Sequence, residues 1–308
     1  MRIVFMGTPE FAIAPLKALL SFNKCQVVAV VSNVDKPVGR KQILTPPPVK
    51  VVAKTLGIPV YQYTKIKTEG LEDLKLLNPD VIVTCAFGQI LSQEILDIPK
   101  FGVINVHASL LPKYRGASPI HYAILNGEKT TGVTIMKTDV GIDTGDMILK
   151  QQVCIGENET CGELFERLSL VGAELLIEAL NLIMEGKAVY EKQDEEKATY
   201  TKIIKKELAL IDFNKPAENV VNQIRAFNPS PVAFTYLSGE QYKIYSATAV
   251  LGDGKPGEIL STENGKLIIA CRTGAISVNV IQKQGGKAIK VSDFLRGNKL
   301  ENGGIFSK

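Results

Sequence analysis

The stretch F-G-V-I-N-V-H-A-S-L-L-P-K-Y-R-G-A-S-P, residues 101–119, contains the most informative residues of this 308-residue chain. Its apolar run Val103–His107 predicts a buried strand, and a helix is predicted to follow at Pro119–Asn126. Asn105 and His107, one of only two histidines, lie two positions apart. In a strand their side chains therefore point to the same face. A polar pair at the carboxyl end of a buried strand indicates a candidate reaction site.

Strands and helices are predicted to alternate before this stretch. The strands are expected at Arg2–Met6, Val27–Ser32, Val60–Tyr63 and Val81–Cys85, and the helices at Pro48–Leu56, Gly70–Leu77 and Leu91–Leu96. Thr8 is expected to cap a first helix that has Pro9 at its first position. This alternation predicts a doubly wound, Rossmann-like α/β domain, whose ligands bind beyond the carboxyl ends of the strands.

The pattern changes after this domain. A hairpin-like strand pair at Gly132–Lys137 and Met147–Val153 precedes a long helix predicted near Thr160–Glu185. Beyond Phe234, short strands with turn signals predict a small β-barrel of the OB type. We therefore expect a first domain at residues 1–188, a polar linker at 189–206 and a second domain at 207–308.

Composition excludes several classes of protein. The apolar runs are far too short to span a bilayer, and no targeting segment precedes the first strand, which predicts a cytoplasmic protein without a membrane partner. Five cysteines are scattered and never have C-x-x-C spacing, so buried or idle thiols are expected rather than disulfides. With two histidines and no H-E-x-x-H, no metal site is expected.

Positive charge is concentrated in the last third of the chain. Residues 200–308 contain 15 basic and 9 acidic residues, whereas the whole chain has a net charge of +4. A basic C-terminal third indicates a polyanionic partner, although such an excess is also common on a solvated surface.

A second polar cluster follows at D-V-G-I-D-T-G-D, residues 139–146. Together, an amide, an imidazole and a carboxylate suit proton transfer beside a carbonyl that becomes an oxyanion. From the residues alone, a second interpretation stays open: His107 is equally compatible with a core histidine, and Asp139, Asp143 and Asp146 with ordinary turn residues.

These motifs resemble the folate-dependent formyltransferases, and most specifically the members that formylate methionyl-tRNA. The matching segments cover nearly the whole chain in the family's order: M-G-T-P at 6–9, A-F-G-Q-I-L at 86–91, N-V-H-A-S-L-L-P-K-Y-R-G at 105–116, G-V-T-I-M at 132–136, D-V-G-I-D-T-G-D at 139–146, R-A-F-N-P at 225–229 and D-F-L-R-G at 293–297. One departure is Ser230, where related enzymes usually carry tryptophan.

The resemblance implies formyl transfer from 10-formyltetrahydrofolate to the methionine amino group of initiator methionyl-tRNA, by a monomer that needs no metal. It also implies that Asn105 and His107 bind the developing oxyanion and that Asp143 is the catalytic aspartate. The residues implied at the folate site are Phe87, Gly88, Gln89, Ile90, Leu91, Ser109, Leu110, Leu111, Pro112, Asp139, Val140 and Gly141.

The resemblance further implies that the electropositive loop 33–50 contacts tRNA, although charge alone fits an ordinary surface loop equally well. The implied tRNA contacts are Lys36, Arg40, Lys41, Lys50, Lys205, Lys206, Lys287 and Lys290. Three other functions fit parts of the sequence: formylation of a small amine such as glycinamide ribonucleotide or an amino sugar, nucleic-acid binding on an inactive enzyme scaffold, and dinucleotide-dependent oxidoreduction. The last is disfavoured because M-G-T-P is not G-x-G-x-x-G.

Overall fold

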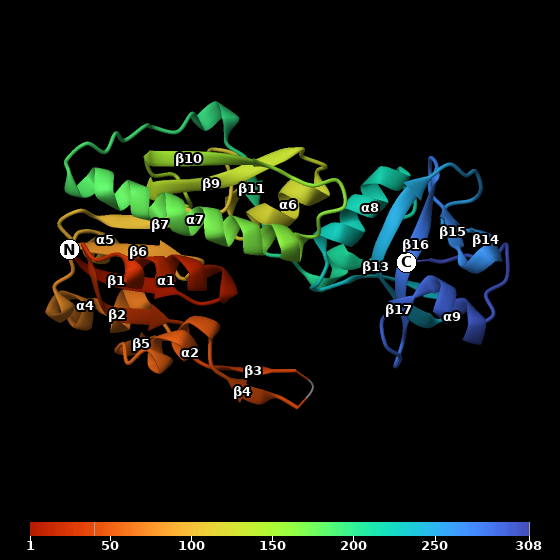
Figure 1. The fold of residues 1–308 in the computed structure, drawn as a ribbon, viewed down its shortest axis with the longest axis horizontal. Helices are drawn as coiled ribbons and strands as arrows, with labels where there is room; N and C mark the ends of the chain where they lie inside the picture. The colour runs from red at the N-terminus through yellow and green to blue at the C-terminus, as the bar shows by residue number, and fades with distance from the viewer. Residues whose placement is uncertain (40, 308) are drawn as a thin grey trace. The chain divides into compact units, whose positions relative to one another are not determined.

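A computed structural model describes residues 1–39 and 41–307 of the chain (Figure 1). The chain forms two compact units. The first comprises Met1–Pro119, Thr131–Val153 and Phe165–Lys202, and the second comprises Ile120–Thr130, Cys154–Leu164 and Ile203–Lys308. The expected domain boundaries at residues 188 and 206 stay a prediction.

The first unit is built on a seven-stranded mixed sheet, in which the strand order is β10-β9-β7-β6-β1-β2-β5. β1 is parallel to both β2 and β6, β6 is parallel to β7, and β9 runs antiparallel to β7. The strand order therefore reverses between β1 and β6, which is where open α/β sheets bind their ligands. The strands are β1 Arg2–Gly7, β2 Gln26–Ser32, β5 Val60–Gln62, β6 Val81–Cys85, β7 Val103–His107, β9 Thr130–Lys137 and β10 Met147–Cys154.

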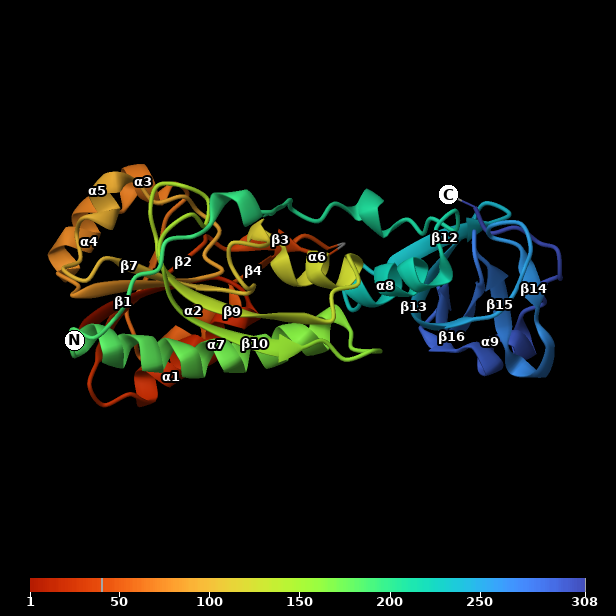
Figure 2. The ribbon, with the colours of Figure 1, turned by 90° about the horizontal axis from the view of Figure 1, so that it is seen from above.

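Helices cover both faces of this sheet, which confirms the predicted doubly wound architecture. Figure 2 shows α1 and α7 on one face and α3, α4 and α5 on the other. No helix of the described residues is both long and apolar enough to cross a bilayer. The helices of this part of the chain are η1 Glu10–Ala12, α1 Ile13–Ser21, α2 Pro48–Thr55, α3 Ile66–Glu69, α4 Leu71–Leu77, α5 Gln93–Leu96, α6 Pro119–Leu125 and α7 Cys161–Met184.

The central strands are apolar along their whole length because both of their faces are buried. Val4 and Met6 of β1 belong to the core that includes Ile66, Leu74 and Ile95 of helices α3, α4 and α5. Ile3 and Phe5 alternate with them and are also fully buried, so they point to the opposite face.

The predicted N-cap at Thr8 is wrong. The first helical turn, η1, has Pro9 as its N-cap, without a side-chain capping bond. The Thr8 hydroxyl instead donates to the carbonyl of Phe87 at 3.1 Å. The hydroxyl therefore bonds to a neighbouring strand loop and accepts no hydrogen bond from the first turn of the helix.

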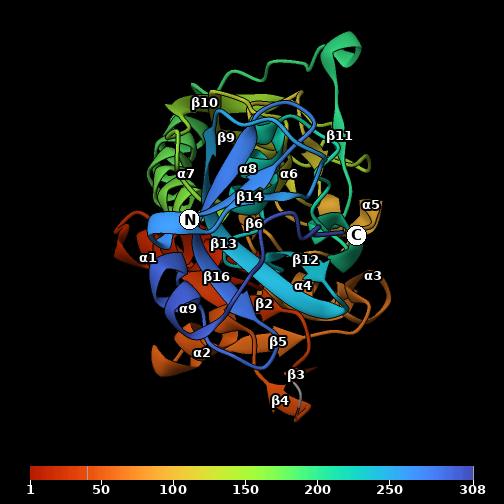
Figure 3. The same ribbon diagram turned by 90° about the vertical axis from the view of Figure 1, so that its right-hand side faces the viewer.

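The second unit contains a curled antiparallel sheet with the order β12-β13-β16-β15-β14, and β17 pairs with β16 (Figure 3). Positive φ values occur at Ser238 and Gly239 and at Asn264 and Gly265, which are turn signals of the sequence beyond Phe234. Helix α8 supplies Val220 and Ile224 to the core of this unit. The elements are α8 Ala217–Ala226, β12 Ala233–Leu237, β13 Glu240–Val250, β14 Ile259–Ser261, β15 Leu267–Ala270, β16 Ala275–Lys283, β17 Ile289–Lys290 and α9 Val291–Gly297.

The remaining elements are short, and two of them form a hairpin that the sequence did not predict. β3 pairs with β4 in antiparallel register within the segment that was expected to be irregular. β8 pairs with β11, which lies in the predicted linker. These elements are β3 Lys36–Val38, β4 Ile43–Thr45, β8 Arg115–Gly116, η2 Glu195–Lys197, β11 Tyr200–Thr201, η3 Lys206–Ala209 and η4 Glu263–Gly265.

Helix α7 approaches the sheet closely at Gly172. A Cβ atom there would lie 2.8 Å from Val106 Cγ1 and 3.5 Å from Val133 Cγ1. We expect Gly172→Val to lower the free energy of unfolding by about 2 kcal/mol, because overpacking forces the helix away from β7 and β9. Urea unfolding followed by circular dichroism measures this.

The matched control is Glu178→Val, which places the same side chain at an exposed position of α7. Equal stability of the two variants would contradict the close approach of helix and sheet.

Candidate active site

The loops that follow β6 and β7 leave the sheet at the same edge. The two strands are parallel neighbours, with Thr84 opposite Asn105 and Cys85 opposite Val106. Residues 86–91 and 108–112 therefore begin side by side. This edge contains most of the residues that the sequence nominated as a site.

Asn105 is oriented by its neighbour on β6. The Thr84 hydroxyl donates to Asn105 Oδ1 at 2.9 Å. This bond directs the amide nitrogen of Asn105 to the other side, where it has no hydrogen-bond partner among the residues described. A donor held in this way is suited to bind an oxygen atom that becomes negatively charged.

His107 is almost completely buried, and both of its ring nitrogens face oxygen acceptors. Nε2 lies 3.1 Å from the Tyr114 carbonyl oxygen, and Nδ1 lies 3.6 Å from Asp143 Oδ2. Because a carbonyl oxygen can only accept, Nε2 carries a hydrogen. A doubly protonated imidazolium can direct its second N–H toward the Asp143 carboxylate, so the pair can hold and transfer a proton.

Asp143 reaches His107 because the chain folds back after β9. The turn begins where Thr138 donates to the carbonyl of Val103, near the start of β7, whereas His107 is at its end. Asp143 has a positive φ of 54°. The backbone N–H of Gly116 donates to its Oδ2 atom at 2.7 Å. The structure thus brings together Asn105, His107 and Asp143.

The loop after His107 is fixed by Thr134 of β9. The Thr134 hydroxyl donates to the Ser109 carbonyl at 2.7 Å and accepts from the Leu111 N–H at 3.1 Å. The Ser109 hydroxyl donates to the Lys113 carbonyl at 2.7 Å. Ser109 and Leu111 are buried, whereas Leu110 and Pro112 are half-buried.

The loop after β6 is fixed by two amide side chains. Asn33 Nδ2 donates to the Phe87 carbonyl at 2.9 Å, and Gln89 Nε2 donates to Asn33 Oδ1 at 2.7 Å. Gln89 Oε1 also accepts from the Ile66 N–H at 2.9 Å. Gln89 therefore shapes this loop through its side chain, while Gly88 adopts a φ of 80°.

Apolar side chains are exposed in two of the segments nominated for the folate site. Ile90 is 72% exposed and Val140 is 64% exposed. Phe87 and Leu91 are buried. Asp139 Oδ1 accepts from the backbone of Gly141 and from the Thr144 hydroxyl, as an ordinary turn residue does. Exposed apolar groups of this kind can cover a flat aromatic ligand.

The nominated tRNA contacts fall into two groups. Lys50 Nζ donates to both carboxylate oxygens of Asp35 and to Gln62 Oε1, at 2.6–2.8 Å. The Lys50 hydrogen bond lowers the pKa of the Asp35 carboxyl. The bonds to Asp35 and Gln62 occupy the ammonium group of Lys50 and disfavour a contact between Lys50 and a phosphate. Arg40 lies outside the described residues, and the exposed lysines are Lys36, Lys41, Lys205, Lys206, Lys287 and Lys290.

Sequence reasoning missed three residues that orient the site: Thr84, Thr134 and Gln193. Thr84 could have been found from the register, since it lies opposite Asn105 on the adjacent strand. Gln193 donates to the carbonyl oxygens of Asp143 and Gly145, both at 2.8 Å. Nothing in the sequence pattern marks Gln193, because it lies 50 residues after Asp143 in a stretch of charged residues.

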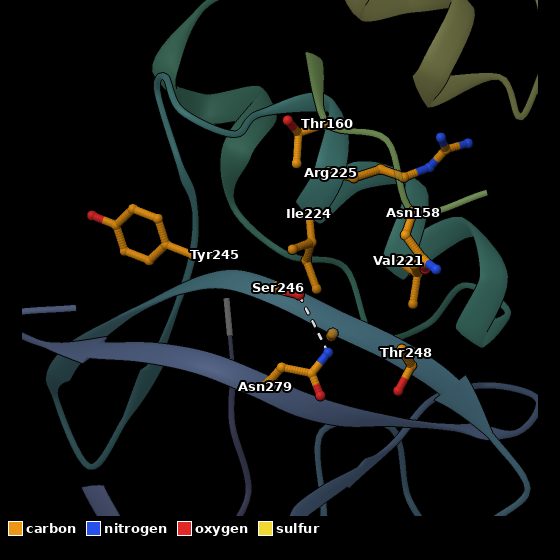
Figure 4. A pocket seen from close by; sticks show the side chains of 10 residues that line it. Asn158, Thr160, Val221, Ile224, Arg225, Tyr245, Ser246, Thr248 and Asn279 are labelled. Atoms are coloured by element: carbon orange, nitrogen blue, oxygen red, sulfur yellow. Dashed lines mark hydrogen bonds between the residues drawn. The ribbon is translucent and has the colours of Figure 1, made fainter. Parts of the chain in front are cut away.

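A separate cavity of about 180 Å³ lies wholly within the second unit, between α8 and β13 (Figure 4). Arg225, at its edge, points away from the strand residues Ser246 and Asn279. Its guanidinium donates to the carbonyls of Gly156 and Glu159 at 3.2 and 3.3 Å. Arg225 thus ties α8 to the segment before α7, which gives this motif residue a structural role.

Two family models match the chain. The model described as formyl transferase matches residues 1–180, and the model described as formyl transferase, C-terminal domain, matches residues 203–299. The doubly wound unit with its amide, imidazole and carboxylate falls within the first match.

Curated relatives refine this class. A methionyl-tRNA formyltransferase of Citrifermentans bemidjiense is 48% identical over 309 residues, which cover 100% of this chain and 97% of the relative. A methionyl-tRNA formyltransferase of Bacillus licheniformis is 48% identical over 98% of this chain and 96% of its own length. The chain belongs to the formyl transferase family, and within it to the methionyl-tRNA formyltransferases.

Solved structures share the fold at low identity. An N-formyltransferase from Helicobacter canadensis, solved with folinic acid and dTDP-3-aminofucose, has a TM-score of 0.68 at 24% identity, covering 91% of this chain and 98% of that one. HypX from Aquifex aeolicus, solved with tetrahydrofolic acid, has a TM-score of 0.63 at 18% identity over 96% of this chain. The present chain spans about half of HypX, 47% of its length.

The hydrogen bond from Thr84 to Asn105 gives a prediction for activity. We expect Thr84→Val to lower kcat for formyl transfer about tenfold, which corresponds to about 1.4 kcal/mol, because the Asn105 amide loses its fixed orientation. Steady-state kinetics measure this.

Thr138→Val is the matched control, because the Thr138 hydroxyl is buried without a hydrogen-bond partner among the described residues. If both variants had unchanged kcat, the orienting role of Thr84 would be wrong.

Proposed function

We propose that the protein transfers the formyl group of 10-formyltetrahydrofolate to the amino group of methionine on initiator methionyl-tRNA, and so produces N-formylmethionyl-tRNA for translation initiation. The observation that carries this proposal is the convergence of Asn105, His107 and Asp143 at one edge of the sheet. The names of the curated relatives support the choice of acceptor. The enzyme acts in the cytoplasm as a monomer.

The three side chains divide the chemistry of formyl transfer. The attacking amine must be neutral, and its attack turns the formyl oxygen into an oxyanion. The unpartnered Asn105 amide donates to this oxyanion, and the imidazolium form of His107 stabilises it through its positive charge. Asp143 keeps His107 oriented and, through a water molecule, accepts the proton that the amine loses. The leaving N10 nitrogen takes up a proton, and tetrahydrofolate is released. With these groups in place the reaction needs no metal.

The formyl donor binds at the loops that follow β6 and β7. Backbone groups of 87–91 and 109–112 provide donors and acceptors for the edge of a pterin ring, while Val140 and Ile90 cover its apolar faces. Two folate-bound structures of the same fold, the Helicobacter canadensis enzyme and HypX, support folate use by this scaffold. Asp139 and Gly141 shape the turn that borders the donor.

Exposed lysines bind the tRNA phosphates. Lys36 and Lys41 belong to the hairpin segment formed by β3 and β4, where Val38, Ile43 and Leu44 are also exposed. A charged hairpin with apolar side chains can contact both the backbone and the bases at the end of an acceptor stem. Lys205, Lys206, Lys287 and Lys290 add charge-based contacts, and the sequence nominates Arg40 as a further one.

Formyl transfer to four acceptors tests the proposal directly. Initiator methionyl-tRNA is expected to be formylated, whereas uncharged tRNA, elongator methionyl-tRNA and an amino-sugar nucleotide are not. His107→Ala is expected to bind tRNA normally and to lower the transfer rate by a factor on the order of 10²–10³. Product on the amino-sugar nucleotide instead would assign the chain to the small-amine formyltransferases.

The proposed lysine contacts predict how tRNA binding depends on salt concentration. We expect the double variant Lys36→Ala/Lys41→Ala to weaken tRNA binding and to reduce the slope of log K against log salt concentration by about 2, roughly one unit per phosphate contact. Fluorescence titration at several salt concentrations measures the slope.

Lys65→Ala/Lys67→Ala is the control, because it removes two exposed lysines from α3 and its N-cap in the same unit. A slope that changed equally in both double variants would show that only net charge matters.

A further inference from the structure

Arg115 is a buried charge next to the catalytic residues. It follows His107 by eight positions and is completely buried, with 0% of its surface exposed. A buried guanidinium is tolerated only when its donors are paired. Among the described residues, its side-chain partners come from the segment 193–200, about 80 residues later in the chain.

The guanidinium donates four hydrogen bonds to these partners, from Nε, Nη1 and Nη2. Nη1 and Nη2 donate to the two carboxylate oxygens of Glu195 at 2.9 and 2.7 Å, and Nη1 also donates to the Tyr200 hydroxyl at 3.0 Å. Nε donates to Gln193 Oε1 at 3.0 Å. The hydrogen bond to Glu195 raises the pKa of Arg115, and the same bond lowers the pKa of Glu195.

The bond from Arg115 decides which way the Gln193 amide points. Because a guanidinium can only donate, the Gln193 atom that faces it must be the oxygen. The Gln193 nitrogen is thereby directed at the Asp143 turn, where it donates to the carbonyl oxygens of Asp143 and Gly145, both at 2.8 Å. Each of its two hydrogens has one acceptor.

Asp143 needs such support because its backbone is in the left-handed region, at a φ of 54°. Non-glycine residues adopt this conformation infrequently, and although aspartate does so more readily than most, contacts to the turn still fix the direction of its carboxylate. The Gly116 N–H, in the peptide after Arg115, donates to the side chain of Asp143. The Arg115 side chain fixes the main chain of Asp143 indirectly, because it orients Gln193. One short segment therefore fixes both parts of Asp143.

The segment that carries Gln193 is itself anchored at both ends. Before it, Glu191 and Met147 exchange two backbone hydrogen bonds at 2.8 Å. After it, Tyr200 pairs with Arg115 and Thr201 with Gly116. The segment from Glu191 to Thr201 therefore crosses the Asp143 turn as a strap with fixed ends.

We propose that Gln193 is a positioning residue for formyl transfer: oriented by Arg115, it holds the Asp143 turn so that the carboxylate faces His107. This inference rests on the proposed function, in which Asp143 takes part in the reaction. The side chain of Gln193 contacts Arg115 and the Asp143 turn, and it acts through Asp143.

Gln193→Glu tests the inference, because glutamate still accepts from Arg115 but has no hydrogens for the two turn carbonyls. We expect kcat to fall about 100-fold, as a displacement of about 1 Å can produce, while KM for both substrates stays within about twofold. Gln152→Glu makes the same exchange at an exposed position of β10 and should leave kcat unchanged. Unchanged kcat in Gln193→Glu would overturn the inference.

A double-mutant cycle with Asp143→Asn separates positioning from general stability. In single-turnover measurements, Gln193→Glu should have less than about a twofold effect once Asp143→Asn is present, because both changes remove the same contribution. If Gln193→Glu lowered the transfer rate about 100-fold in the Asp143→Asn variant as well, Gln193 would act elsewhere and the inference would be overturned. Normal turnover of Asp143→Asn by itself would instead contradict the catalytic role of Asp143 in the proposed function.

Urea unfolding of each variant accompanies the kinetics. If Gln193→Glu is less stable than the wild type, Gln193→Met, which is uncharged and of similar length, is measured under the same criteria. If the variant that is as stable as the wild type has a lowered kcat, the positioning role is supported. If its kcat is unchanged, the positioning role is contradicted.

Discussion

The buried guanidinium of Arg115 is the constraint on which the geometry of the candidate active site depends. A charge without solvent contact requires hydrogen-bond partners, and Gln193, Glu195 and Tyr200 supply four such bonds beside the loop that follows His107. Because residues 193–200 lie beside this loop, β11 can pair with β8. The polar stretch that follows α7 thereby becomes part of the first unit, up to Lys202.

The candidate active site combines residues that are close in the sequence with one that is distant. Asn105 and His107 are two residues apart on one strand, so the strand geometry alone puts them on the same face. Asp143 reaches them only because the turn after β9 folds back from the opposite end of β7. The first relation is local and robust, whereas the second needs hydrogen bonds from Gly116 and Gln193 to be maintained.

The structure also shows that the lysines nominated for tRNA contact differ in how free their charges are. Lys50 belongs to the same basic segment as Lys36 and Lys41, yet its ammonium is paired with Asp35 and Gln62. The partner Gln62 lies on β5, which is adjacent to β2 in the sheet. Sheet order therefore decides whether a lysine is available to a polyanion or is used within the fold. The β3 and β4 hairpin was missed because its three-residue strands are exposed and carry no alternating pattern.

The sequence by itself determined the alternation of the first unit, the strand-rich second unit and the pair formed by Asn105 and His107. These features depend on hydrophobic periodicity, turn residues and the geometry of one strand, all of which are local. Tertiary structure decided the contacts of Asp143, Gln193, Thr84 and Thr8, because each joins positions that are at least 20 residues apart. Such contacts are set by sheet order and by the pairing of buried charge, and neither is encoded in the spacing of residues along the chain.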